Sequence, residues 1–275
     1  MSEAAGGAGG AGPLTVAADG PVRLITLNRP ESLNAVNREL DEALARVFTA
    51  VSDDPGARAA VVTGAGRAFC AGGDIDYIRA MQEDRALRRS ALDNGKRIVT
   101  SMIRCRVPVI AAVNGPAVGL GCSLAALSDV VFMAASAYLA DPHVAIGLVA
   151  GDGGPLTWPA HASLLLCKEH LLTGDPITAE RAAQMGLANH VVPDEQVLDR
   201  ALAWAHRIAG MPQQAVQDTR RLLNLPLERQ ALAGMDFAFA AEDRSFDTDD
   251  LSRNVRRFLD RRQQKPVSRQ AGETQ

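Results

Sequence analysis

Short apolar runs alternate with longer amphipathic stretches in the first third of the chain. Residues 22–27 are rich in β-forming side chains and end at the breaker Asn28-Arg29-Pro30, which predicts a strand. Between residues 40 and 51, apolar side chains recur at helical spacing with charged residues between them, which predicts an amphipathic helix. Residues 59–63 form a second apolar run that ends at glycines. We therefore expect a strand–helix–strand unit that is long enough for a right-handed crossover between parallel strands.

The same alternation continues through the middle of the chain. Residues 77–106 carry many charges and have a helical pattern, whereas residues 107–113 are almost continuously apolar, as expected for a strand covered on both faces. A glycine-rich turn then leads to a short predicted helix over 121–127 and a strand over 130–133. From about His161 onward the pattern is helical.

Capping residues mark helix ends in the last third of the chain. Thr178 is of the type that caps a helix start, and Gly186 is of the type that follows a helix end. Apolar side chains share one face over residues 194–210, and Thr248-Asp249-Asp250 opens a last predicted helix.

These patterns predict an α/β protein with one core and a helical appendage. The α/β core covers residues 14–195, and the helical region covers residues 196–263. The Gly/Ala-rich residues 1–13 and the polar residues 264–275 are expected to be disordered tails.

Composition narrows the class of protein. The 275 residues are 47% hydrophobic and 22% charged, which fits a globular protein with a sizeable core. The net charge is -3, so basic residues are not in excess and nucleic acid is not an expected partner. Glycines and polar residues interrupt the apolar stretch 107–140, so we expect buried core and no membrane span. The four cysteines lack C-x-x-C and zinc-site spacings, so we expect reduced thiols, no metal and a cytoplasmic protein.

Two glycine-containing turns, residues 67–75 and 113–123, each join a predicted strand to a predicted helix. Small residues let a ligand approach the backbone closely, and the free N–H groups at a helix start favour an anionic oxygen. Asp74 can cap the helix that follows the first turn. Either turn alone is a weak signal, because most turns of this kind are only turns.

Four ordered motifs give the chain a resemblance to a known family. They are Leu27-Asn28-Arg29-Pro30 with Leu33-Asn34-Ala35, residues 68–74, residues 108–122, and Leu172-Thr173-Gly174 with Gly186-Leu187-Ala188. Over residues 14–263 the sequence resembles the crotonase (enoyl-CoA hydratase/isomerase) superfamily. The resemblance implies a spiral of repeated ββα units with C-terminal helices that pack in a homotrimer or a dimer of trimers. It also implies an acyl-CoA substrate, with coenzyme A as part of that substrate and no permanently bound cofactor.

The resemblance assigns binding roles to individual residues. It places an oxyanion hole at the backbone N–H groups of Gly73 and Leu120. Most relatives have glycine at the position of Leu120, and the backbone donor survives that change. By the same resemblance, the coenzyme A contacts are Leu33 and Ala35 at the adenine, Gly73, Asp74, Ile75 and Asp76 along the pantetheine, and Phe258 and Arg261 from a neighbouring subunit.

The acid–base residues depart from the family pattern. A hydratase of this family normally uses two glutamates, and the matching positions here hold Ser123 and His143. His143 titrates near neutrality and can act as a base, while Asp152 can orient it or hold a water. The competing interpretation is a loop histidine and a turn aspartate without chemistry. The spacing of His143 and Asp152 also resembles the branch that hydrolyses carbon–carbon bonds in cyclic β-diketones, the 6-oxocamphor hydrolase type, and Glu242 is the candidate for that branch's late glutamate.

Three functions therefore stand as hypotheses. The first is an acyl-CoA enzyme of the hydratase or isomerase type, a lyase by ancestry. The second is a carbon–carbon bond hydrolase that acts on β-diketones without coenzyme A. The third is a non-catalytic protein that binds acyl-CoA.

Overall fold

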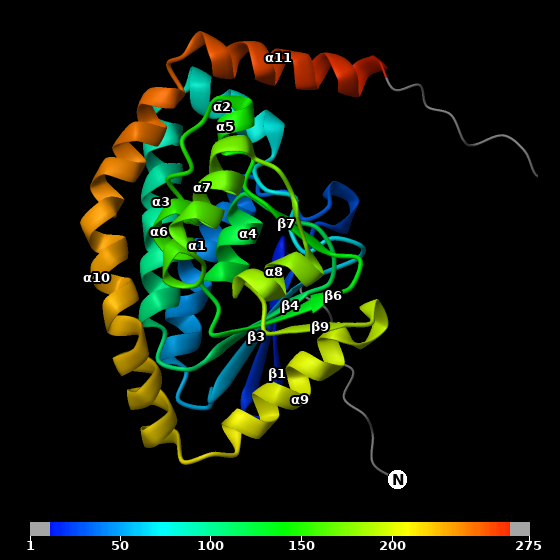
Figure 1. The fold of residues 1–275 in the computed structure, drawn as a ribbon, viewed down its shortest axis with the longest axis vertical. Helices are drawn as coiled ribbons and strands as arrows, with labels where there is room; N and C mark the ends of the chain where they lie inside the picture. Colours follow the sequence, from blue (N-terminus) through cyan, green and yellow to red (C-terminus); the bar gives the residue numbers. More distant parts are fainter. Residues whose placement is uncertain (1–11, 265–275) are drawn as a thin grey trace, which may run out of the picture.

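A six-stranded sheet lies at the centre of the protein, for which a computed structural model describes residues 12–264. In the strand order β1-β2-β3-β4-β6-β9, β1 and β2 are antiparallel and the other neighbours are parallel (Figure 1). The strands are β1 (Leu14–Asp19), β2 (Val22–Leu27), β3 (Ala59–Gly64), β4 (Val109–Val113), β6 (Val130–Ala134) and β9 (His190–Val192). β3 and β4 are buried along their whole length, which explains their continuous apolar sequence.

Helices supply most of the remaining core. α9 packs against β2, β3, β4 and β6, while apolar side chains of α1 and α3 join the same hydrophobic cluster. The helices are α1 (Arg38–Asp53), α2 (Ile75–Glu83), α3 (Arg85–Arg104), α4 (Leu120–Ala126), α5 (His143–Ile146), α6 (Gly154–Thr157), α7 (Leu164–Thr173), α8 (Ala179–Met185), α9 (Val197–Ala209), α10 (Gln213–Ser245) and α11 (Asp249–Gln264), with 3-10 turns η1 (Pro30–Ser32), η2 (Trp158–Ala160) and η3 (Asp194–Gln196).

A second, three-stranded sheet takes part in a strand–strand–helix unit that occurs more than once in the fold. It contains β5 (Ala117–Val118), β7 (Tyr138–Ala140) and β8 (Ile177–Thr178) in the order β5-β7-β8. In β4-β5-α4 and again in β6-β7-α5, the chain places one strand in the large sheet, one in the small sheet, and then turns into a helix. The prediction of an α/β fold with repeated ββα units and a helical C-terminal region is therefore confirmed.

Several helix boundaries follow the capping residues. Asp74 caps α2 by accepting the Asp76 N–H, and Thr178 caps α8 by accepting the Arg181 N–H, as expected. Gly186 ends α8 in the left-handed region at φ 86°. The four cysteines are buried free thiols, also as expected.

Other sequence-based boundaries were wrong. The helical stretch expected over residues 77–106 begins at Ile75, ends at Arg104 and divides at Asp84, which accepts the Ala86 and Leu87 N–H groups and starts α3. The chain after His161 was expected to be helical, but it also contains β8 and β9. These strands are only two and three residues long and are formed by pairing with β7 and β6. The expected tails fall largely in residues 1–11 and 265–275, outside the described residues, and Gln264 belongs to α11.

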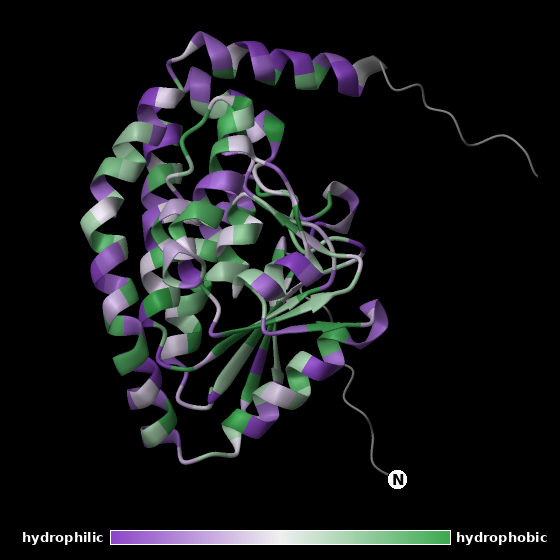
Figure 2. Ribbon diagram, in the orientation of Figure 1, coloured by the Kyte–Doolittle hydropathy of each residue, from purple (hydrophilic) through white to green (hydrophobic). Residues whose placement is uncertain are grey.

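The last helix contacts the helix that begins at the end of the first turn. α11 packs against α2 and α5, with Leu251 and Val255 in a small apolar cluster that includes Ile78 and Leu148. Most residues of α11 are hydrophilic, whereas most residues of the central strands are hydrophobic (Figure 2). No helix within residues 12–264 is both long and apolar enough to cross a membrane.

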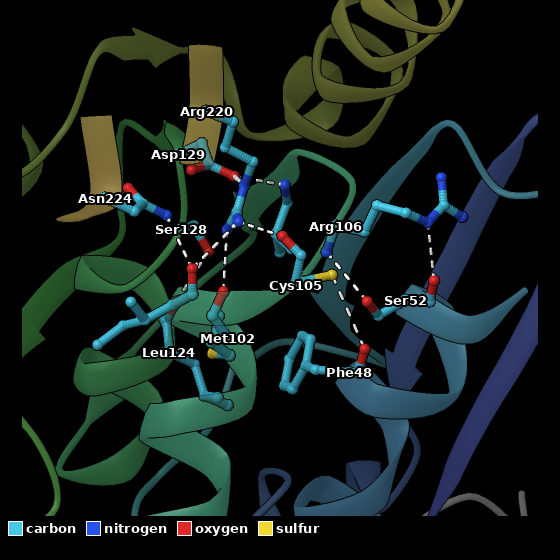
Figure 3. A network of polar contacts seen from close by, with 12 residues as sticks. Phe48, Ser52, Met102, Cys105, Arg106, Leu124, Ser128, Asp129, Arg220 and Asn224 are labelled. Atoms are coloured by element: carbon cyan, nitrogen blue, oxygen red, sulfur yellow. Dashed lines mark hydrogen bonds and ion pairs between the residues drawn. The ribbon is translucent and has the colours of Figure 1, made fainter. Parts of the chain in front are cut away.

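A buried arginine ties α10 to the end of α3 (Figure 3). Arg220 forms an ion pair with Asp129 (Nε to Oδ2, 2.7 Å) and donates to the carbonyl oxygens of Met102 (2.9 Å), Ile103 (3.2 Å) and Cys105. Carbonyl groups at a helix end have no partner within the helix, so the guanidinium satisfies them. Asp129 also accepts the Val109 N–H at 2.7 Å, as expected for a residue that satisfies backbone donors.

We predict that Arg220→Met lowers the free energy of unfolding by about 3 kcal/mol, because it leaves the partly buried Asp129 without its opposite charge and removes the guanidinium donors from the end of α3. The matched control is Arg221→Met on the same helix, where the arginine is 48% exposed and pairs with Glu228. That change is expected to cost at most about 1 kcal/mol. Urea unfolding of both variants measures the difference, and equal losses would contradict the prediction.

Candidate active site

The two glycine-containing turns lie side by side. Cys70 and Ala117 form a parallel bridge in which the Cys70 N–H donates to Pro116 O (3.0 Å) and the Val118 N–H donates to Cys70 O (2.8 Å). The start of α4 also packs tightly here, because a Cβ on Gly121 would lie 2.6 Å from Cys70 Cβ. Segments some fifty residues apart therefore form one local structure.

Glycines are required where the turns meet. Gly72 has φ 85° and Gly119 has φ 53°, both in the region that favours glycine. A Cβ on Gly119 would lie 3.6 Å from Gly72 Cα, and a Cβ on Gly72 would lie 3.1 Å from Val118 O. The residues that follow these two glycines are Gly73 and Leu120, so the close approach brings the predicted pair of donors into the same region.

The N–H groups of Gly73 and Leu120 are both available to a ligand. Val36 bonds with Gly72 O (2.7 Å) and with the Asp74 N–H (3.0 Å), so the Gly73 N–H between them faces away from Val36. Leu120 is the first residue of α4, where an N–H has no partner within the helix. Neither N–H has an acceptor among residues 12–264.

The imidazole of His143 lies against the second turn. A Cβ on Gly119 would lie 3.4 Å from His143 Cε1 and 3.9 Å from its Nε2. His143 is the first residue of α5, which follows β7, and the Gly119 N–H donates to Ala140 O at 2.9 Å. The loop that carries His143 is thus held directly to the turn that presents the Leu120 N–H.

Carboxylates stand on both sides of His143. Asp141 Oδ1 lies 2.5 Å from Nδ1, and Asp152 Oδ1 lies 3.9 Å from Nε2. The hydrogen-bond partner of the ring is therefore Asp141. Of the two roles expected for Asp152, its 3.9 Å distance does not fit orienting the ring, and holding a water stays a prediction. No role was expected for Asp141, although a carboxylate two residues before a histidine, across Pro142, is a usable signal. Ser123 Oγ donates to Asp152 Oδ1 at 3.5 Å, so the partner of the Ser123 hydroxyl is the Asp152 carboxylate.

The charges in this cluster change the protonation of His143. Burial by itself lowers the pKa of His143, but the Asp141 and Asp152 carboxylates outweigh burial and raise that pKa to about 10. Burial raises the pKa of Asp152, while the nearby His143 charge opposes the rise. The raised pKa favours a protonated imidazole at neutral pH, which suits a proton donor. The expected role of His143 as a base stays a prediction.

Glu242 reaches the same cluster from α10. Its side chain is buried, and a Cβ on Gly151 would lie 2.3 Å from its Oε2. Burial first, and then the Asp152 charge, raise the pKa of Glu242 to about 8. Oε2 has no hydrogen-bond partner within the described residues. The structure thus brings Ser123, His143, Asp152 and Glu242 together and adds Asp141.

We predict that Glu242→Gln makes the protein relatively more stable at high pH. The folded-state pKa of about 8 exceeds the ordinary 4.5, so the folded state binds the proton more tightly. The stability that this tighter proton binding gives the folded state is fully present below about pH 4.5 and is lost as pH rises toward about 8. Glutamine mimics the protonated acid, so the variant should gain stability over wild type between about pH 5 and about pH 8 in urea unfolding.

Glu228→Gln on the same helix is the control for this prediction. Its side-chain hydrogen bond with Arg104 lowers the pKa of Glu228, so its contribution is already present at about pH 5 and stays constant above it. The substitution should therefore cost the same stability at both pH values. A Glu242→Gln variant that follows wild type at every pH would contradict the buried, proton-binding state.

The residues expected to contact the adenine and the pantetheine lie at or against the first turn and form the rim of the site. Leu33 is left-handed (φ 54°) and its carbonyl accepts the Ala71 N–H, which holds the loop containing Ala35 against the first turn. Asp74 contacts Arg29 (3.3 Å), and Asp76 pairs with Arg262 of α11 (2.9 Å) at the start of α2, where Ile75 is the first helical residue. Phe258, which is 55% exposed, and Arg261 lie on α11.

An open groove of about 840 Å3 lies elsewhere in the fold. It is formed by α9, the first part of α10 and the end of α4, and its walls include Trp204, Ile208, Val216 and Leu223. The groove is apolar and contains none of the acid–base residues described above. Its size alone does not make it the reactive site.

Comparisons with known proteins agree on one family. The family described as Enoyl-CoA hydratase/isomerase matches residues 18–267. The chain is 32% identical to a crotonyl-CoA hydratase of Syntrophomonas wolfei, covering 90% of this chain and 94% of that protein. A probable enoyl-CoA hydratase of Rhizobium meliloti is also 32% identical, with 90% and 95% covered. A solved structure of an enoyl-CoA hydratase/isomerase from Mycobacterium paratuberculosis is 57% identical, has a TM-score of 0.87, and covers 89% of this chain and 98% of that chain.

Proposed function

The chain belongs to the enoyl-CoA hydratase/isomerase family of the crotonase superfamily, and from this premise we propose that it acts on acyl-CoA thioesters and stabilises an enolate at the thioester carbonyl. The observation that carries the proposal is the pair of free N–H groups of Gly73 and Leu120 on adjoining turns. A carbonyl oxygen that gains negative charge accepts from both donors. Removing one such donor typically costs about 10²–10³ in rate.

Asp152 and His143 supply the acid–base pair in place of two glutamates. In hydration of a 2-enoyl thioester, Asp152 takes a proton from water while the water oxygen bonds to the β-carbon. The electron pair of the carbon–carbon double bond passes to the carbonyl oxygen, which the two N–H groups hold. His143, which carries a proton in the free site, then delivers one to the α-carbon, and the pair returns to its starting state by proton exchange.

Coenzyme A binds along the rim as part of the substrate. Leu33 and Ala35 contact the adenine, and Gly73 to Asp76 follow the pantetheine. In a homotrimer or a dimer of trimers, Phe258 and Arg261 contact the coenzyme A of a neighbouring subunit. The exposure of large apolar side chains on α10, with Leu223 72% and Phe237 74% exposed, supports an assembly that covers them. Light scattering of the purified chain measures its mass in solution.

The composition of the acid–base cluster favours a second candidate, hydrolysis of a carbon–carbon bond in a β-diketone. The cluster holds a histidine with Asp152, both partly buried, and the buried Glu242. Water adds to one carbonyl carbon, the bond to the central carbon breaks, and its electron pair leaves on the second carbonyl as an enolate. Protonation of that enolate yields a ketone and a carboxylic acid, so the atoms of one water are consumed.

Substrate turnover distinguishes these functions. Purified protein is assayed with crotonyl-CoA and longer 2-enoyl-CoA thioesters, and separately with a cyclic 1,3-diketone without coenzyme A. Thermal shift with coenzyme A and acyl-CoA thioesters of several lengths reports binding, because a ligand that binds only the folded state raises its stability. Turnover of an enoyl-CoA is the expected result.

The remaining outcomes are also decisive. Turnover of the diketone alone would replace the first proposal by the second. Tight binding of acyl-CoA without any conversion would indicate a non-catalytic binding protein.

A further inference from the structure

Asp141 lies behind His143, on the side of the ring away from Asp152. Its carboxylate is only 1% exposed and contacts Nδ1, whereas Nε2 points toward Asp152 Oδ1. We propose that Asp141 is a positioning residue, which keeps a proton on Nδ1 and thereby makes Nε2 the ring atom that exchanges protons. The inference rests on the proposed function and adds a residue to its site.

The backbone holds Asp141 in place from both ends. Ala140, the residue before it, ends β7 and accepts the Gly119 N–H at 2.9 Å. Pro142, the residue after it, has a restricted φ, and its carbonyl accepts the Ala145 N–H at 3.0 Å. The carboxylate therefore has little freedom to leave the imidazole.

The surroundings leave room for an aspartate and no more. A Cβ on Gly154 would lie 2.3 Å from Asp141 Oδ2, so a glycine at the start of α6 makes space for the carboxylate. Oδ2 has no hydrogen-bond partner among residues 12–264. A buried carboxylate oxygen left in this state is costly, so its retention next to a histidine is better explained by a role at that histidine than by stability.

Three acidic side chains face His143, and they come from three places. Asp141 lies between β7 and α5, Asp152 lies between α5 and α6, and Glu242 lies on α10. Within the described part of the chain, Asp141 alone is at hydrogen-bond distance from the ring. A carboxylate can only accept, so the neutral ring must hold its proton on Nδ1 and leave the Nε2 lone pair free.

Nitrogen-15 NMR of the ligand-free full chain, labelled in histidine, tests this assignment. His143 is identified by the signal missing from His143→Gln. In wild type, Nδ1 should remain protonated at every pH and Nε2 should be the nitrogen that titrates. A neutral ring protonated on Nε2 would overturn the proposal without any variant of Asp141.

The second experiment uses Asp141→Asn, which keeps the shape of the side chain and removes its charge. Loss of the adjacent negative charge should lower the His143 titration midpoint by about 1–3 pH units, since an adjacent opposite charge shifts a pKa by that amount. It should also lower kcat more than it changes KM. The control Asp129→Asn removes a carboxylate that pairs with Arg220 and should leave the midpoint unchanged.

A folded Asp141→Asn protein with the wild-type midpoint would overturn the proposal, even if its stability has fallen. The NMR readout uses no substrate. Failure of the proposed function, seen as wild-type protein that converts no enoyl-CoA, is therefore distinguishable from failure of the positioning role.

Discussion

Replacing Leu120 by proline is expected to lower kcat for an acyl-CoA substrate by about 10²–10³-fold, because proline has no backbone N–H and one of the two oxyanion donors is lost. Such a backbone donor cannot be removed by changing a side chain, and few positions in a helix accept proline. Leu120 is one of them, since it is the first residue of α4. Its N–H makes no bond within the helix, and the fixed φ of proline suits this position.

The residue before the substitution also tolerates proline. Proline restricts its predecessor through clashes with that residue's N–H and Cβ, and Gly119 has no Cβ. Leu120→Ala is the matched control, because it loses the same buried leucine side chain while it keeps the N–H. Steady-state kinetics of the two variants, with acyl-CoA binding by thermal shift, isolate the donor. Equal kcat values for Leu120→Pro and Leu120→Ala would contradict an oxyanion role for this N–H.

The two turns were predictable because their signal is local. A strand end, glycines and a helix start lie within about ten residues in each turn, and the physics of free N–H groups at a helix start is independent of the rest of the fold. The family resemblance then paired the turns. The sequence did not predict that Cys70 and Ala117 bridge the turns, because such pairing depends on how distant strands are arranged.

The acid–base cluster was predictable only in part, because its contacts depend on side-chain direction. His143, Asp152 and Glu242 were expected, yet the partner of Nδ1 proved to be Asp141. Glu242 lies ninety residues after Asp152 on a helix that continues through Pro226, and no local pattern predicts where that helix passes. The raised pKa of His143 was missed for the same reason, since it results from several carboxylates close to one partly buried ring.

His143→Gln is expected to lower kcat by about 10²–10⁴-fold, the usual contribution of a positioned general acid or base. Glutamine is polar and of similar length but cannot exchange a proton with substrate. Asp152→Asn should cost a similar factor, because each residue completes the proton transfer that the other begins. The double variant should be little worse than either single one, since residues that act as a unit are strongly non-additive.

The control for His143→Gln is the same change at His206, which is 41% exposed and pairs with Asp19 on the surface. That variant should keep kcat and KM, so any general effect of replacing histidine by glutamine is excluded. Acyl-CoA binding by His143→Gln should persist, because the two N–H groups and the coenzyme A rim are unchanged. If His143→Gln retained full turnover while binding normally, proton transfer would have to come from Asp152 and Glu242 alone, and the imidazole would be a structural part of the buried charge cluster.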